Sequence, residues 1–134
     1  MKAFTLMEVM VVIILLTVVA SFAIPNYADS VNRTRVRDAV SQLSVLNAAN
    51  AVYNAQANAF YPGTGLTIDS INSGLNINLI ANSLTYSYTR SSTTAYTATA
   101  AYGSTFTVQV NQAAISSTNP CCSAGNCYSI VPAC

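Results

Sequence analysis

The sequence predicts an α+β protein in which a long N-terminal α-helix packs against a small antiparallel β-sheet. Residues 4–24 are predominantly apolar and residues 26–58 contain no Gly or Pro, which favours one long helix. From residue 84 onward, apolar side chains recur at every second position, which is typical of strands with one buried face. The apolar face of such a sheet must be covered by another element, and the amphipathic half of the helix can cover it.

The first half of the predicted helix is long enough to cross a bilayer. At 1.5 Å per residue, residues 4–24 form a helix about 31 Å long, close to the ~30 Å hydrocarbon core. Glu8 is the one ionisable residue in it. A carboxylate within a spanning helix costs roughly 2.5–3.5 kcal/mol, so a functional role is its default interpretation. Because this segment contains no cation, we expect the partner of Glu8 to be the α-amine of a neighbouring chain that begins at Phe4.

The start of the chain combines several features at fixed spacings. They are Lys2-Ala3, then Phe4-Thr5-Leu6-Met7-Glu8, an apolar run, and Ile24-Pro25-Asn26-Tyr27. In these features, and in Arg33 and Tyr61-Pro62, about the first 62 residues resemble a type IV pilin. The resemblance implies that residues 1–3 are a short prepilin leader, that a prepilin peptidase cuts after Ala3, and that Phe4 is then N-methylated. Ala3 stands where the family usually has Gly.

The resemblance also implies a function. The chain is expected to be a structural subunit of a type IV pilus or related filament, polymerising through its hydrophobic helix. Phe4 and Glu8 would then set the register between subunits. Its expected partners are further copies of itself, the bacterial inner membrane before assembly, the prepilin peptidase and the pilus assembly machinery. The precursor would lie in the inner membrane, and the product would be an extracellular filament.

Two alternatives remain open at this stage. One is a pseudopilin of a type II secretion system; pseudopilins often carry a calcium site made by acidic residues in the C-terminal region, whereas no carboxylate follows Asp69 here. The other is a membrane-anchored or secreted binding domain. In that case Lys2 and Ser21-Phe22-Ala23 would belong to a secretory signal peptide.

Composition argues against catalysis. Charged residues make up 7% of the chain, there is no His or Trp, and beyond Asp38 the charged side chains are Asp69 and Arg90. General acid–base chemistry needs a titratable group near its working pH, usually with a second beside it. We therefore expect no enzyme, no cofactor and no metal site. The sequence also lacks the basic stripe of a nucleic-acid-binding protein.

The remaining segments follow in order. Pro25 removes one backbone donor, so we expect a kink or a loosened turn there, with an amphipathic continuation of the helix over residues 25–60. In an assembled filament at least one turn between residues 17 and 27 should lack regular helix hydrogen bonds. A connecting segment over 61–83 and a three-stranded antiparallel sheet over 84–112 should come next.

The last segment, residues 113–134, is predicted to be a loop rich in cysteine. It holds Cys121, Cys122, Cys127 and Cys134. On the oxidising side of a membrane these favour disulfides over zinc, since the spacing lacks two CxxC pairs and no His is present. A vicinal bond is strained, which leaves two pairings open. They are 121–134 with 122–127, and 121–127 with 122–134.

Overall fold

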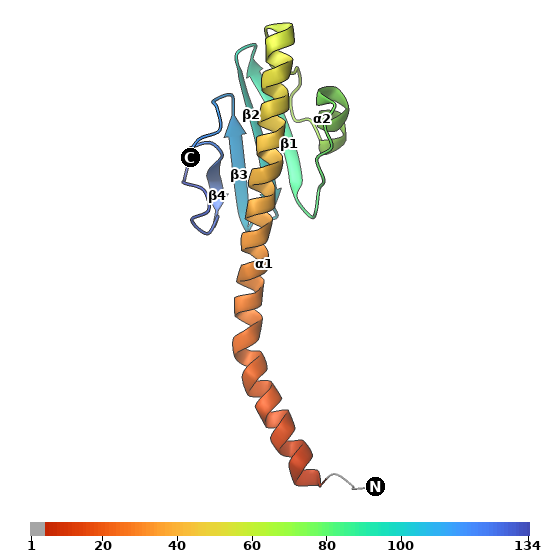
Figure 1. The fold of residues 1–134 in the computed structure, drawn as a ribbon, viewed down its shortest axis with the longest axis vertical. Helices are drawn as coiled ribbons and strands as arrows, with labels where there is room; N and C mark the ends of the chain where they lie inside the picture. The colour runs from red at the N-terminus through yellow and green to blue at the C-terminus, as the bar shows by residue number, and fades with distance from the viewer. Residues whose placement is uncertain (1–4) are drawn as a thin grey trace. The chain divides into compact units, whose positions relative to one another are not determined.

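The computed structural model describes residues 5–134, apart from the side chains of residues 23–26. Ala3 and Phe4 therefore lie outside the described residues. The elements in chain order are α1 (Leu6–Ala57), α2 (Ile68–Leu75), β1 (Thr85–Ser92), β2 (Ala95–Tyr102), β3 (Phe106–Asn111) and β4 (Cys121–Gly125) (Figure 1). The chain divides into two compact units, residues 1–32 and 33–134.

The first unit contains the apolar part of α1. An 18-residue window of this helix has a mean hydropathy of 2.6 and none of it is buried, so α1 is long and apolar enough to cross a membrane. Pro25 lies within the bounds of α1. The loosened turn expected near Pro25 concerns an assembled filament and stays a prediction.

In the second unit, the part of α1 from Arg33 onward lies along one face of an antiparallel sheet whose strand order is β1-β2-β3-β4 (Figure 1). The predicted α+β class is confirmed. Alternate side chains of the first three strands are buried beneath the helix because every second position along a strand points to the same face. Four fully buried side chains supply the helix side of this core: Val36, Ala39, Leu43 and Leu46.

The sheet has four strands, not the predicted three. The fourth, β4, lies within the segment predicted to be a loop and pairs with β3 through Val108↔Cys122 and Gln109↔Cys121. Its sequence, CCSAG, has no apolar alternation, and only Cys121 is buried in it. The strand is therefore defined by its backbone pairing with β3 and by the disulfides of its cysteines, and not by an alternation of apolar side chains.

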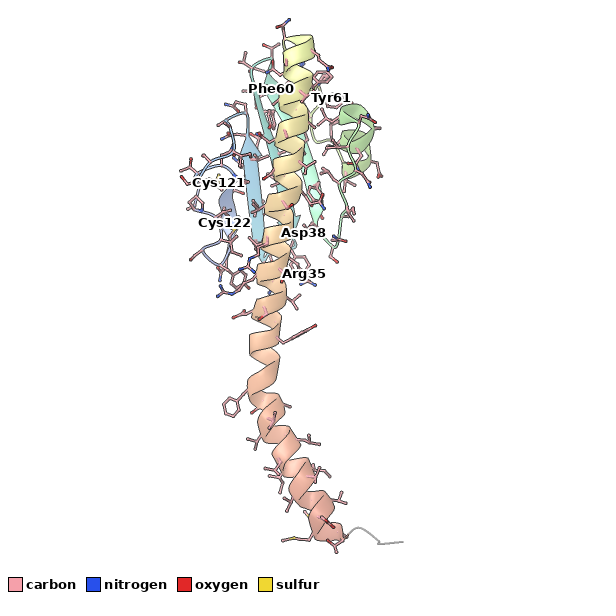
Figure 2. All side chains as sticks on the ribbon, in the orientation of Figure 1. Arg35, Asp38, Phe60, Tyr61, Cys121 and Cys122 are labelled. Carbon is pink, nitrogen blue, oxygen red and sulfur yellow. A yellow bond between two sulfur atoms is a disulfide. The ribbon has the colours of Figure 1, made fainter. Side chains whose placement is uncertain are left out.

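The connecting segment between α1 and β1 contains α2, which the sequence did not reveal. Ile71 anchors this short helix in the core, and Asn76 ends it in the left-handed conformation. Ahead of α2, the chain turns back from the end of α1 through Phe60 and Tyr61 (Figure 2). The ring of Phe60 packs on Tyr96 with centroids 4.9 Å apart.

The cysteines form two disulfides, Cys121–Cys134 and Cys122–Cys127. This is one of the two pairings that the sequence left open. The bonds close loops with sequence separations of 13 and 5. In the chain-entropy model, such loops contribute about 3 and about 2 kcal/mol to stability. They hold the C-terminal segment on β4, where Cys122 also bridges to Ala133.

Two asparagines of α1 are buried in the interface with the sheet. Asn50 is fully buried; its Nδ2 donates to Tyr88 Oη at 2.9 Å and its Oδ1 accepts from the Tyr61 backbone N–H at 2.9 Å. Asn47 Nδ2 donates to Tyr96 Oη at 2.8 Å and to the Asn111 carbonyl at 2.7 Å. These bonds fix the helix against particular strands because buried polar groups must be paired.

Replacing Asn50 with leucine should lower the free energy of unfolding by about 2–3 kcal/mol, because the Tyr61 N–H loses its acceptor and a buried polar network is broken. Asn54→Leu, one turn further along α1 at a half-buried position, is the matched control and should change stability by no more than about 0.5 kcal/mol. Thermal unfolding of the detergent-solubilised chain, followed by circular dichroism, measures both. Equal stability of the two variants would contradict the role given to Asn50.

Candidate functional site

Glu8 lies in the first turn of α1 and closes the helix N-terminus together with Thr5. The Glu8 N–H donates to Thr5 Oγ1 at 3.2 Å, and the Thr5 N–H donates to Glu8 Oε2 at 3.4 Å. This is the reciprocal arrangement of a capping box, in which two otherwise unpaired amides gain acceptors. The partial positive charge of a helix N-terminus also favours a carboxylate at this position.

Thr5 is the residue that the sequence interpretation missed. The signal was present, since Thr5 followed three residues later by Glu8 and then an apolar run is the capping-box pattern. The capping box shows that Glu8 has a local structural role in addition to any role between chains. Any test of Glu8 must therefore separate its charge from its capping.

The surface around Glu8 is apolar and uncovered. Glu8, Val9, Val12 and Ile13 line a shallow groove of about 280 Å³. Between Leu6 and Phe22 every large apolar side chain is exposed, from 47% for Val11 to 79% for Leu6. So large an apolar surface needs a lipid environment or other protein to cover it. Within that surface, Glu8 supplies a carboxylate that can accept a cation.

The other predicted site residues are placed separately. Pro25 lies within α1. The four cysteines belong to the second unit, and all of them are disulfide-bonded. Among the described residues, no three His, Cys, Asp or Glu side chains gather as a metal site.

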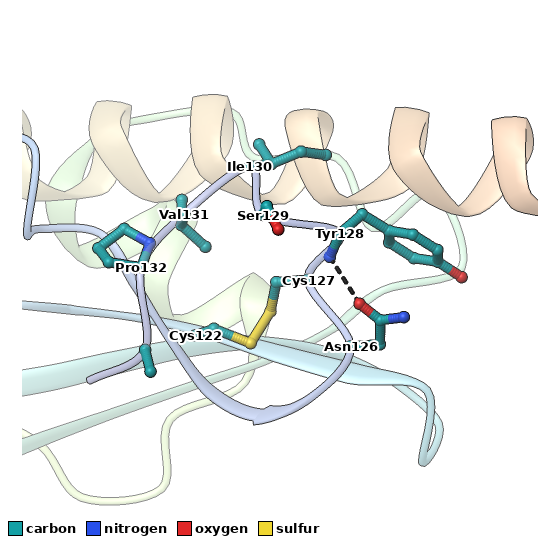
Figure 3. A pocket seen from close by; sticks show the side chains of 9 residues that line it. Cys122, Asn126, Cys127, Tyr128, Ser129, Ile130, Val131 and Pro132 are labelled. Carbon is teal, nitrogen blue, oxygen red and sulfur yellow. Dashed lines mark hydrogen bonds between the residues drawn. A yellow bond between two sulfur atoms is a disulfide. The ribbon is translucent and has the colours of Figure 1, made fainter.

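A second cavity, of about 500 Å³, lies under the C-terminal loop (Figure 3). It is lined by residues 126–133 and Cys122, so the Cys122–Cys127 bond forms part of its wall. The Tyr128 N–H donates to Asn126 Oδ1 at 2.8 Å, and the guanidinium of Arg33 lies over the Tyr128 ring at 5.2 Å. The lining contains no carboxylate or imidazole, so it offers no general acid–base pair.

Burial governs the titration of the core tyrosines. It raises the pKa of Tyr96, against the opposing effect of the Asn47 hydrogen bond. Burial also raises the pKa of Tyr86, with a further contribution from the negative charge of Asp38. Their hydroxyls therefore stay neutral at physiological pH. Tyr96 both packs in the core and hydrogen-bonds to Asn47, whereas the buried Tyr86 hydroxyl has no hydrogen-bond partner among the described residues.

Part of the chain is similar to known fimbrial proteins. It is 46% identical to a fimbrial protein of Pseudomonas aeruginosa over 48 residues, which are 36% of this chain and 31% of the relative. It is 48% identical to the type IV major fimbrial protein FimA of Dichelobacter nodosus over 40 residues, which are 30% of this chain and 25% of that relative. Over these stretches the chain is similar to type IV fimbrial proteins.

The homology is limited in extent. The chain spans 31% and 25% of the length of these curated fimbrial relatives. No family model matches it, and no solved structure matches it. The long N-terminal helix and the small antiparallel sheet are nevertheless consistent with an α+β pilin fold.

Proposed function

We propose that this pilin homologue is the structural subunit of a type IV pilus or related filament and that it polymerises through its N-terminal hydrophobic helix. The observation that carries the proposal is the surface of α1 between Leu6 and Phe22, which is exposed and apolar and contains a single carboxylate at Glu8. Lipid covers this surface in the precursor, and the same helices of other copies cover it in the filament.

Glu8 determines which register the packed helices adopt along their axes. Burying an unpaired carboxylate is costly, so copies that pack side by side are driven to bring a cation to it. In the proposed filament that cation is the α-amine of a neighbour's Phe4, made available when the prepilin peptidase removes residues 1–3. Assembly thus favours the axial register in which the amine meets the carboxylate.

The precursor stage follows from the same helix. Its length and composition suit an inner-membrane helix, from which the assembly machinery would extract the subunit. The fimbrial names of the relatives favour a pilus over a type II secretion pseudopilin. An anchored or secreted binding domain would leave the Glu8 carboxylate capped by Thr5 but without a cation to pair with.

Electron microscopy of sheared surface material, combined with N-terminal sequencing of the released protein, tests the proposal. We expect thin filaments whose subunit begins at N-methylated Phe4. Recovery of the chain only as a monomer, with no filaments in the sheared fraction, would instead support an anchored or secreted binding domain.

A further inference from the structure

The second unit contains few charges, and most of them are already engaged. The guanidiniums of Arg33 and Arg35 lie over the rings of Tyr128 and Tyr102, at 5.2 and 4.1 Å from the centroids. Arg90 Nη1 donates to the Phe60 carbonyl at 3.1 Å. Asp38 Oδ2 accepts from Asn82 Nδ2 at 3.2 Å (Figure 2 shows Arg35 and Asp38 on the helix).

One cation and one anion are left over. Arg37 and Asp69 are exposed, and neither side chain makes a hydrogen bond, ion pair or ring contact with any other described residue. Asp69 lies in the first turn of α2, where its negative charge interacts favourably with the helix dipole. Asp69 does not cap the helix, and the N-cap residue, Thr67, makes no side-chain hydrogen bond. The two charges are opposite in sign and equal in number per copy.

Arg37 and α2 lie at different levels along the unit. The C-terminal end of α2 borders α1 at a groove lined by Ala49, Val52 and Asn76. Arg37 precedes Ala49 by about 18 Å along the helix axis at 1.5 Å per residue. Copies that are offset along a filament axis can bring such separated groups together. A heterologous contact of this kind repeats the same pair at every interface.

We propose that in the filament Asp69 of one copy pairs with Arg37 of a neighbouring copy. This inference rests on the proposed filament function and adds a second contact to it, between the globular parts of the subunits. Pairing opposite charges across an interface fixes its register and disfavours contacts between like charges. In a chain with 7% charged residues, little else on these surfaces could do so.

The test uses Arg37→Lys, which keeps the positive charge and introduces an amine. The sequence contains one lysine, Lys2, which lies in the leader that the proposed processing removes. A carbodiimide joins an amine to a touching carboxylate as an amide and takes up the released water as a urea. In sheared Arg37→Lys filaments we expect crosslinked peptides that join positions 37 and 69 of two chains. Wild-type filaments and dispersed subunits should give none.

Charge exchange provides a second measurement. Asp69→Arg should reduce filament yield at least about tenfold, because it sets like charges against each other. Combining it with Arg37→Asp should restore the yield, and Asp69→Glu should retain it. Ser91→Arg introduces an arginine at an exposed position of β1 and should leave the yield unchanged.

The outcomes separate this pairing from the filament itself. If the wild-type chain forms no filaments, the proposed function fails. If wild-type filaments form but the Arg37→Lys filaments lack the 37–69 crosslink, or join position 37 to Asp29 or Asp38 instead, the pairing is wrong whatever the yield of Asp69→Arg.

Discussion

Replacing Ala3 with leucine should stop maturation of the chain and leave no filaments on the cell. In the proposed pathway the peptidase cuts after a small residue, and a leucine side chain at that position would not fit. Uncut subunits would keep residues 1–3 and would have no free amine at Phe4. Glu8 would then have no cation to meet in a packed helix core, where leaving a charge unpaired costs about 3–5 kcal/mol.

Intact mass of the membrane fraction, together with counts of sheared filaments, measures this effect. The variant should accumulate in the membrane at the mass of the uncut chain. Ala3→Gly is the matched control, because Gly is the residue that pilins usually have there, and it should mature and assemble normally. Assembled filaments that contain an unmodified Met1 would show that this cleavage is not required.

The sequence predicted the sheet as far as side-chain alternation extends. Strands β1 to β3 alternate apolar and Ser/Thr residues, so their existence could be read from the sequence. Strand β4 has no such alternation, and its pairing with β3 depends on disulfides whose connectivity sequence leaves open. Helix α2 is only eight residues long, too short for a decisive helical period.

The buried asparagines show a different limit of sequence interpretation. An Asn in an amphipathic helix is ordinarily exposed. Asn47 and Asn50 are instead buried because their amides meet Tyr96 and Tyr88, which are 49 and 38 residues away in the chain. Partners at such separations become visible only when the helix lies on the sheet. Glu8, by contrast, is recognisable from its immediate neighbours in the sequence, because it is the one ionisable residue of an apolar segment.

Glu8 has two functions in the proposed mechanism, and they make different demands. Capping α1 requires an acceptor that reaches the Thr5 N–H, and Glu or Gln can provide it. Pairing with a neighbour's amine requires a negative charge, which Gln lacks. Glu8→Gln therefore retains the capping box and removes the ion pair, whereas Glu8→Val removes both. The two variants together separate helix capping from filament assembly.

Both Glu8→Gln and Glu8→Val should reduce filament yield sharply while the subunit remains inserted in the membrane. Either change leaves the neighbour's Phe4 amine buried without its counter-charge, at a cost of about 3–5 kcal/mol per contact. Since each 1.4 kcal/mol is tenfold in an association constant, the loss exceeds about a hundredfold. Insertion should be unimpaired, and better for Val, because the membrane no longer holds a carboxylate. Sheared-filament yield, normalised to the subunit in the membrane fraction, is the measurement. Normal assembly of Glu8→Val would refute the mechanism, and normal assembly of Glu8→Gln alone would reduce the role of Glu8 to capping.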